Sequence, residues 1–357
     1  MKINMEGGSE TKKSLSELDL VDKRILYHLS KNSRQSYKDV AKKIGKNHRF
    51  VQKKYMELAP YIKRYMPVVG YQHLGYTTIT FYIQLTGSIK NIDKIIESVK
   101  YLPEVNIIIK TQGGYDLIVG TLFKTTKDIY EGIKNIRRDF GDNIRVFDTL
   151  IHIGASYFGH RYLNPESEKK ILDIPFTGDW TKEQKVIHMN NNKNKILKVL
   201  ATNANIRNDV IAQETGLNPI QVRKIIRDME EERLIEEYSF VPNSPDIYRI
   251  FVRLYNANED VINKFRQFGY LNIETIQVVR TIGMYTLFYD IYAPNNFALM
   301  KWSNQLKKEL GDYIVEQKIT NLWYIERFTY YHIDPKVLKR LEEKKLKNVF
   351  HNFDKTE

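Results

Sequence analysis

The sequence predicts an α+β fold in which two winged helix-turn-helix domains alternate with two ferredoxin-like βαββαβ domains. The first observation behind this prediction is a repeat: the pattern G-x-N-x-x-x-V at Gly45 returns at Gly216, a shift of 171 residues. The second is that KTQGGYDL from Lys110 returns loosely as RTIGMYTL from Arg280, a shift of 170. Because two unrelated patterns share nearly one offset, we infer a duplicated unit, whose period is far too long for stacked small repeats.

Composition narrows the class of protein. At 357 residues the chain has room for roughly two to four domains. The net charge of +13 and the pI near 9.4 favour a polyanionic partner, since clustered Lys and Arg gain affinity for nucleic acid by releasing condensed counterions. No apolar run approaches the roughly 20 residues that span a bilayer, and the N-terminus lacks the apolar core of a signal peptide, so we expect a cytoplasmic protein without a membrane partner. The absence of cysteine excludes disulfides, thiolate catalysis and thiolate zinc sites.

Residues 17–72 are predicted to form the first winged helix-turn-helix domain. A helix with one apolar stripe is followed by a short helix that stops at Gly45, and Asn47 then caps a third helix. The apolar stripe of this third helix leaves a basic and amide-bearing side for DNA. The side chains expected at the DNA are Asn47, His48, Arg49, Gln52 and Lys53. The strand that follows has the composition of a wing, where Lys63 and Arg64 are expected to contact phosphate rather than bases.

Residues 190–245 are predicted to repeat this domain. Its second helix ends at Gly216, and Asn218 followed by Pro219 makes a strong start for the third helix, because a cap precedes proline at the first helical position. The side chains expected at the DNA are Asn218, Gln221, Arg223, Lys224 and Arg227. We expect the third helix of each domain to dock in a major groove, where Arg suits guanine and Gln suits adenine. Because the two helices differ in sequence, the two DNA half-sites are expected to differ as well.

The segments after the two DNA-binding domains, residues 73–158 and 246–333, each alternate strand, helix, strand, strand, helix and strand. Runs rich in Val, Ile, Tyr and Thr mark the strands, and a glycine turn separates the two central strands in both copies. This order is typical of a ferredoxin-like domain whose sheet has one packed and one available face. The remaining predicted segments are a flexible tail at 1–16, a linker at 159–189 and a basic C-terminal helix or tail at 334–357.

Three stretches together resemble the Lrp/AsnC family of transcription regulators: LDLVDKRIL from Leu18, the G-x-N-x-x-x-V turn, and PEVN with KTQGGYDLIVG. The resemblance spans residues 18 to about 155, and residues from about 193 to 332 follow the same order more weakly, so the chain resembles a tandem fusion of two such regulators. It implies that the winged helices bind double-stranded DNA and that the βαββαβ domains dimerise and bind amino acids or related effectors. A fused pair implies a built-in pseudo-dimer, and the family's assembly implies a homo-oligomer, a dimer of tandem chains.

The resemblance also places an effector loop after the second strand of each βαββαβ domain. Its residues are Gly113, Gly114, Tyr115 and Asp116 in the first copy and Gly283 and Tyr285 in the second. Thr286 stands where the first copy has Asp116, so an amino-acid effector would find no carboxylate for its ammonium group there. A plain turn between strands also accounts for these glycines. In a second departure, the family's arginine three residues after the helix-three valine is Lys54 in one copy and Ile225 in the other.

Two other functions fit parts of the sequence. Siroheme decarboxylases resemble the same two-module architecture, with His152, His160 and Arg161 as candidate tetrapyrrole contacts. No nucleophile with a base, carboxylate pair or phosphate loop is placed by spacing, so we expect neither an enzyme nor a bound cofactor. The eight histidines show no compact ligand spacing, so no metal site is expected. The third interpretation is a chromatin-like protein that coats DNA with little sequence preference.

Overall fold

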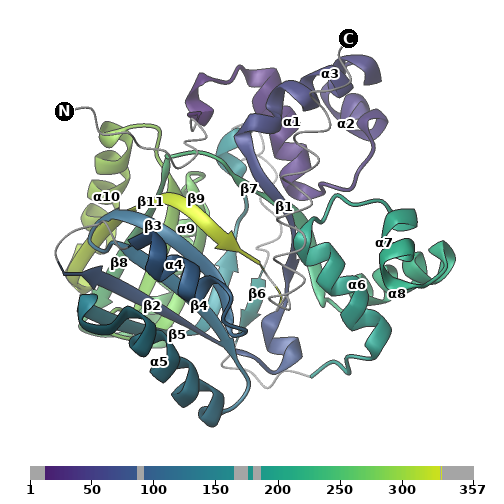
Figure 1. Cartoon of the computed structure of the whole chain (residues 1–357). Coiled ribbons are helices and arrows are strands. Elements are labelled where there is room, and N and C mark those ends of the chain that lie inside the picture. The colour runs from purple at the N-terminus through teal and green to yellow at the C-terminus, as the bar shows by residue number, and fades with distance from the viewer. Residues whose placement is uncertain (1–12, 87–91, 165–175, 180–185, 330, 332–357) are drawn as a thin grey trace, which may run out of the picture.

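The computed structural model describes residues 13–86, 92–164, 176–179, 186–329 and 331. Within these ranges, two groups of helices lie side by side next to a large β-barrel (Figure 1). The predicted C-terminal helix or tail at 334–357 and most of the predicted N-terminal tail lie outside the described residues. Every helix in the described ranges is too short or too polar to cross a bilayer.

The first helical group consists of α1 (Leu20–Lys31), α2 (Tyr37–Ile44) and α3 (His48–Leu58). Each helix begins at a side-chain cap, because Asp19, Ser36 and Asn47 each accept a hydrogen bond from the backbone N–H three residues on. α2 ends at Gly45, whose φ of 68° lies in the left-handed region that favours glycine. The predicted helix, turn and capped third helix therefore form at the predicted positions.

The second helical group consists of α6 (Asn191–Thr202), α7 (Asn208–Thr215) and α8 (Pro219–Glu231). α7 ends at Gly216, with a φ of 73°, in the same way as α2 ends at Gly45. Asn218 caps α8 and forms a capping box with Gln221, in which each side chain accepts the other residue's backbone N–H. Pro219 occupies the first helical position, where its missing N–H costs nothing.

A two-stranded antiparallel ribbon connects the two helical groups. It consists of β1 (Ile62–Val69) and β7 (Ile235–Pro242). The predicted wing strand therefore forms, but its partner comes from the second copy rather than from its own domain. Because each copy supplies one such strand, pairing them satisfies backbone groups that a lone strand would leave open.

Two βαββαβ units follow the helical groups. The first contains β2 (Thr77–Leu85), α4 (Ile92–Lys100), β3 (Val105–Gly113), β4 (Leu117–Phe123), α5 (Thr126–Phe140) and β5 (Ile144–Tyr157). The second contains β8 (Ile247–Leu254), α9 (Glu259–Leu271), β9 (Thr275–Gly283), β10 (Leu287–Tyr292), α10 (Asn296–Leu310) and β11 (Ile314–Phe328). Both units have the predicted order of strand, helix, strand, strand, helix and strand.

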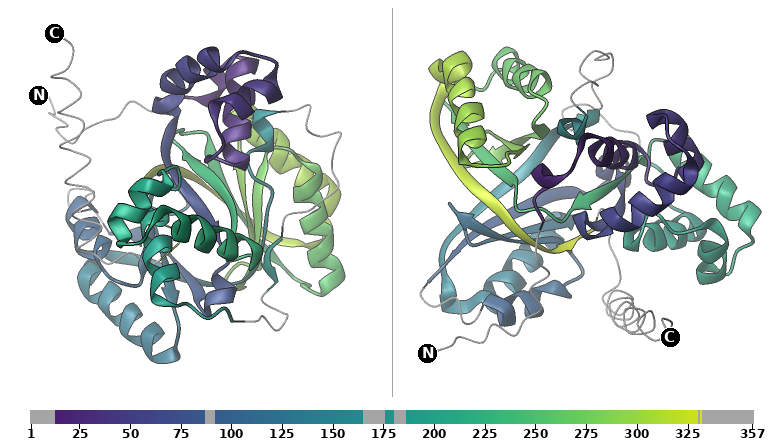
Figure 2. Two further views of the ribbon diagram at one scale, coloured as in Figure 1. Left: turned by 90° about the vertical axis from the view of Figure 1, so that its right-hand side faces the viewer. Right: turned by 90° about the horizontal axis from the view of Figure 1, so that it is seen from above.

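The eight strands of the two units close into one barrel. Their order is β2-β4-β3-β11-β8-β10-β9-β5, and β5 returns to pair with β2. The helices α4, α5, α9 and α10 pack against the outside (Figure 2). The sheet face expected to stay available is instead the barrel interior, filled by aromatic side chains from both units, among them Tyr82, Tyr115, Phe251 and Tyr285.

Glycine permits close approach where the two units meet. Gly113 at the end of β3 pairs with Thr320 of β11, and Gly283 at the end of β9 pairs with Leu150 of β5. A Cβ on Gly283 would lie 2.4 Å from the carbonyl oxygen of Thr149, and the φ of 147° is one that other residues rarely adopt. These glycines therefore serve the junctions of the barrel.

The predicted linker at 159–189 is partly described. A short strand, β6 (Phe176–Asp179), pairs antiparallel with β5, so this part of the linker docks on the barrel. Residues 165–175 and 180–185, which include most of ILDIPF and Trp180, lie outside the described residues.

Candidate nucleic-acid interface and barrel cavity

The outer side of α3 carries the predicted reading side chains of the first domain. His48, Arg49, Gln52 and Lys53 are all exposed, whereas Val51 and Leu58 on the same helix are buried. Asn47 is also exposed, but its Oδ1 accepts a hydrogen bond from the Phe50 N–H at 2.8 Å. The first domain therefore presents two cations, an amide and an imidazole around a capped helix start.

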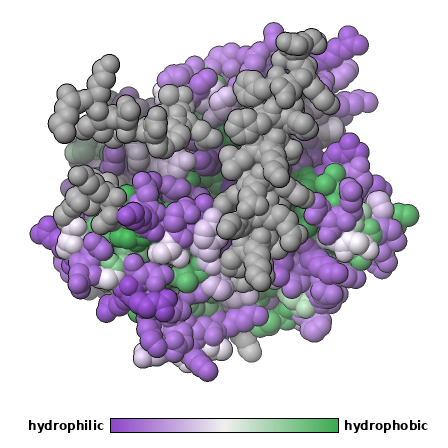
Figure 3. Space-filling view, in the orientation of Figure 1, coloured by the Kyte–Doolittle hydropathy of each residue, from purple (hydrophilic) through white to green (hydrophobic). Residues whose placement is uncertain are grey.

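The outer side of α8 is similar in form and different in chemistry. Gln221, Arg223, Lys224 and Arg227 are exposed, and Val222, Ile226 and Met229 are buried. The Gln221 Oε1 accepts the Asn218 N–H at 3.3 Å, so the capping box occupies part of that amide. Ile220, which the sequence prediction left out, is 79% exposed at the second position of the helix. Where side chains of the helical groups are visible in Figure 3, hydrophilic and hydrophobic ones lie side by side.

Lys54 and Ile225, the positions that depart from the family pattern, point toward their own domains. Lys54 Nζ lies 3.1 Å from Asp22 and 3.3 Å from Glu57, and these carboxylates raise its pKa. Ile225 packs against the core of the second helical group. The difference between the two copies at this position is therefore one of internal packing.

The two predicted wing cations have partners within the chain. Lys63 Nζ donates to the Tyr324 hydroxyl at 3.2 Å and lies 4.6 Å from the centre of that ring. The Arg64 guanidinium donates to the carbonyl oxygens of Phe328, Ala201 and Thr202, at 2.7, 3.2 and 2.8 Å. In the structure, β1 is paired on the ribbon, and Arg64 connects it to α6 and to the end of β11. A phosphate contact by either cation stays a prediction.

A second arginine holds the two helical groups against each other. Arg34, between α1 and α2, donates to the carbonyl oxygens of Ala204 and Ile206, at 2.7 and 2.9 Å, and to the side chain of Asn208. From α3, the Tyr55 hydroxyl accepts a hydrogen bond from Asn205. The sequence prediction missed these contacts, because the partners of Arg34 lie 170 residues or more away and no local pattern marks them.

The predicted effector loops have well-defined partners inside the barrel. The Asp116 carboxylate accepts the Leu85 N–H at 2.8 Å, and the Thr286 hydroxyl accepts the equivalent Leu254 N–H at 3.1 Å. The Asp116 carboxylate and the Thr286 hydroxyl thus accept the equivalent backbone hydrogen bond in the two copies. Tyr115 and Tyr285 are buried, and the Tyr115 hydroxyl donates to Asp148 at 2.6 Å.

The surroundings of Gly114 agree with this barrel role. A Cβ there would lie 2.5 Å from the Lys318 side chain, and Lys318 Nζ lies 3.7 Å from the centre of the Tyr115 ring. The geometry gives the loop residues structural roles, and their effector role stays a prediction.

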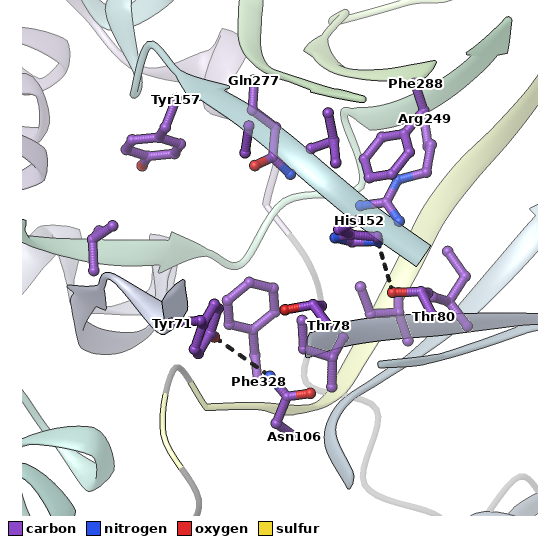
Figure 4. A pocket seen from close by; sticks show the side chains of 16 residues that line it. Tyr71, Thr78, Thr80, Asn106, His152, Tyr157, Arg249, Gln277, Phe288 and Phe328 are labelled. Carbon is purple, nitrogen blue, oxygen red and sulfur yellow. Dashed lines mark hydrogen bonds between the residues drawn. The ribbon is translucent and has the colours of Figure 1, made fainter. Parts of the chain in front are cut away.

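A cavity of about 100 Å³ lies between the ribbon and the barrel interior. Figure 4 shows its lining, with Arg249 and His152 toward one end and Tyr71, Thr78 and Asn106 toward the other. Thr78 Oγ1 and Asn106 Oδ1 are buried without a hydrogen-bond partner in the described part of the chain. A second space of about 80 Å³ shares Arg249, Gln277 and Phe328 with it and reaches the β7 side of the ribbon. Buried polar atoms of this kind are usually satisfied by water or a ligand.

Charge at the cavity is balanced by a buried ion pair. Arg249 Nε and Nη2 each lie 2.7 Å from a carboxylate oxygen of Asp290, and Nη1 donates to the Tyr82 hydroxyl at 2.7 Å. Burial alone would lower the Arg249 pKa, but Asp290 raises it above its ordinary value. Burial lowers the pKa of His152 to about 3, and its Nε2 lies 3.0 Å from the Thr80 hydroxyl. The lining is therefore neutral overall near pH 7.

The other candidate tetrapyrrole contacts are occupied within the chain. His160 is buried, with Nδ1 2.9 Å from the Tyr162 hydroxyl and Nε2 3.1 Å from the Phe240 carbonyl oxygen. Arg161 donates to the carbonyl oxygens of Gly269, Tyr270 and Asn272. Only His152 lines the cavity, whose 100 Å³ is small beside the roughly 300–1,000 Å³ of ordinary ligand pockets. His160 lines the second space, of about 80 Å³, instead.

Comparison with known proteins identifies relatives of the chain. A family model described as winged helix-turn-helix DNA-binding matches residues 189–236. An uncharacterised HTH-type transcriptional regulator of Pyrococcus furiosus is 26% identical over 134 residues, which cover 36% of this chain and 86% of that protein. Another from Pyrococcus horikoshii is 30% identical over 126 residues, which cover 34% of this chain and 82% of that protein.

A solved structure matches the chain along most of its length. The siroheme decarboxylase NirDL aligns with a TM-score of 0.54 and 11% sequence identity, covering 91% of this chain and 99% of that one. At this identity the likeness concerns the fold alone.

Proposed function

This chain belongs to the Lrp/AsnC family of transcription regulators, and from that premise we propose that it binds double-stranded DNA sequence-specifically with both of its reading helices. In this proposal α3 and α8 enter successive major grooves of one duplex, and the chain acts as a pseudo-dimer. Regulators that read DNA with a helix-turn-helix use two such helices, one per half-site. Here both helices come from a single chain.

The observation that carries the proposal is the way in which the two exposed helix starts are held. The ribbon β1–β7, the Arg34 contacts and the Arg64 contacts connect the two helical groups in three places. A fixed relative position reduces the entropy lost when both helices bind one duplex. The closure of the barrel by β3–β11 and β5–β9 pairing supports the same pseudo-dimer, because each junction joins one unit to the other.

Selection of bound DNA from a random pool tests the proposal. The whole chain is expected to enrich one motif with two unlike half-sites, bound about 10³-fold or more tightly than random duplex at physiological salt. Equal recovery of all sequences would identify a protein that coats DNA and would overturn the proposal.

The mass of the complex on the selected duplex gives the number of chains bound. A single chain on both half-sites is the direct form of the pseudo-dimer. We also propose that chains associate further into a dimer of tandem chains, which the same measurement would detect as a doubled mass.

A small effector in the barrel cavity is the second candidate function. The unpartnered Thr78 and Asn106 oxygens favour a ligand with a hydrogen-bond donor, and the balanced Arg249–Asp290 pair favours one with no net charge. Because the ribbon covers this cavity, an occupant would act on the connection between the two DNA-binding domains. The resemblance to effector-binding regulators suggests a small amino acid, whose zwitterion is neutral overall.

Thermal unfolding of the whole chain with each of the twenty amino acids tests this role. A ligand at 100 times its Kd adds about 2.7 kcal/mol of stability, which raises Tm by several degrees. Thr78→Val with Asn106→Leu should abolish the increase, whereas Thr86→Val, outside the cavity, should preserve it. If no amino acid raises Tm, this candidate function fails.

A further inference from the structure

Ile220 occupies an unusual place for a large apolar side chain. It is 79% exposed, and it is the second residue of α8. A single exposed isoleucine is ordinary on a protein surface, so exposure alone carries no meaning. What makes Ile220 informative is its position in the helix-turn-helix.

The two copies align without a gap through this region. Asn47 and Asn218 both cap their helices, and Val51 and Val222 are both buried four residues later. Ile220 therefore stands at the position that Arg49 holds in α3. In a helix-turn-helix, N-terminal residues of the third helix contact base edges. One copy presents a guanidinium at this reading position and the other a branched hydrocarbon.

The chemistry of the major groove limits what such a hydrocarbon can recognise. Guanine, adenine and cytosine present hydrogen-bonding groups along their exposed edges, and only thymine adds a methyl group that an apolar side chain can contact. Arg49, by contrast, can donate two hydrogen bonds to guanine.

The start of α8 is also rigid. Pro219 fixes the backbone before Ile220, and the capping box between Asn218 and Gln221 surrounds it with two hydrogen bonds of 2.8 and 3.3 Å. Isoleucine itself has few rotamers in a helix. The backbone at Ile220 is thus fixed before any DNA arrives and its side chain has few conformations to lose, which lowers the entropy cost of a methyl contact.

The helices that precede the readers differ in charge. On α2 and the turn after it, the exposed cations are Lys38, Lys42, Lys43 and Lys46. The equivalent positions on α7 and its turn are Asp209, Gln213, Glu214 and Leu217. Because the helix that precedes the reading helix crosses the phosphate backbone, we expect the first domain to make phosphate contacts that the second lacks.

We propose that the two DNA-binding domains divide their tasks: the first anchors the chain on phosphates and reads guanine with Arg49, and the second reads a thymine methyl through Ile220. This inference rests on the proposed function. It assigns the half-site under α8 a thymine at the base pair nearest the helix start.

Replacing thymine with deoxyuridine removes only the methyl group and tests the inference. On the selected operator, deoxyuridine in the α8 half-site should weaken binding by the whole chain about fourfold, the value of one buried methyl group. The same change under α3 should have little effect. Ile220→Ala should bind both versions of the α8 half-site equally, and Leu271→Ala, at an exposed position on α9, should keep the fourfold difference.

The salt dependence tests the division of tasks. Lys42→Ala with Lys43→Ala should reduce the slope of log K against log salt by about 1.8, since each phosphate contact contributes about 0.9. Ile220→Ala should leave that slope unchanged, which also shows that the variant is folded and bound.

The outcomes separate the two proposals. If an operator is selected but deoxyuridine has no effect in either half-site, or if Ile220→Ala still distinguishes thymine from uracil, this inference is overturned and sequence-specific binding stands. If no operator is selected, the proposed function fails and the inference fails with it.

Discussion

Two buried histidines make stability depend on pH. Burial lowers the pKa of His152 to about 3 and that of His160 to about 4, against about 6.5 in an unfolded chain. Between pH 6.5 and 4 the unfolded state therefore binds protons that the folded state does not. The stability that the two neutral histidines contribute is fully present above pH 6.5. The free energy of unfolding then falls as pH decreases, by up to about 1.4 kcal/mol per pH unit for each histidine.

Glu236 acts in the opposite direction over the same range. Burial raises its pKa to about 7, so the folded state keeps a proton that the unfolded state releases above about pH 4.5, and stability decreases as pH rises. The effects of Glu236 and of the histidines on the free energy of unfolding therefore partly cancel. The contribution of one histidine has to be measured as the difference between the parent chain and a variant that lacks it.

His152→Gln should reduce the stability lost between pH 6.5 and 4.5 relative to the parent chain, because an amide can keep the hydrogen bond to Thr80 and does not titrate. Urea unfolding at several pH values measures this. His48→Gln, at an exposed position, is the control and should follow the parent. A parallel pH dependence of the His152 variant and the parent would show that His152 is not the titrating group.

Gly283→Ala should destabilise the barrel. The new Cβ would lie 2.4 Å from the Thr149 carbonyl oxygen, and the φ of 147° costs a further ~1–3 kcal/mol for a residue with a side chain. Thermal unfolding should show a Tm lower by several degrees. Gly311→Ala, where a Cβ meets nothing within 4 Å, should change Tm little. Equal Tm values for the two variants would contradict the junction role.

At the scale of elements, local signals predicted the helices and strands well. The glycine that ends α2, the asparagine caps and the apolar stripes each act within a few residues, so the sequence shows them directly. The pairing of β1 with β7 was not predictable in this way. The composition of each strand fits a wing and a ribbon equally well, and the strand with which it pairs lies in the other copy.

The candidate site likewise has features that local sequence patterns predict and features that depend on distant parts of the chain. Exposure of Arg49 and Arg223 follows from helical periodicity, and the structure confirms it. The glycine turn at Gly113 would look the same in sequence whether it formed a ligand-binding loop or packed closely against a neighbouring strand. Only the position of β11, which pairs with Gly113, distinguishes the two roles. The cavity is lined by strands of both βαββαβ units and by the ribbon, so no local sequence signal marks it.

Arg34→Ala with Arg64→Ala should loosen the connection between the two helical groups. Five backbone carbonyl oxygens lose a donor, and the relative position of α3 and α8 becomes less defined. Affinity for the complete operator should fall about tenfold or more, while affinity for a single half-site stays nearly unchanged.

Fluorescence anisotropy on the two duplexes measures both affinities. Lys134→Ala with Arg138→Ala, at exposed positions on α5, controls for the loss of two positive charges. An equal fall on half-site and complete operator would indicate a direct phosphate contact instead of a connecting role.

For the whole molecule, the barrel and the ribbon combine two reading helices into one unit. In the proposed function, the net charge of +13 attracts the chain to any duplex, and the unlike surfaces of α3 and α8 supply the preference for one sequence. The two helices share their asparagine caps and buried valine, and they differ at the exposed positions.

The most direct test of this account is the affinity of two double variants for the complete selected operator. Arg49→Ala with Lys53→Ala removes reading groups from α3, and Arg223→Ala with Lys224→Ala removes them from α8. If both helices read one duplex, each pair should cost about 1–3 kcal/mol and relax base preference only in its own half-site. Full affinity and unchanged base preference in either variant would show that its helix does not read the DNA, and would contradict the pseudo-dimer.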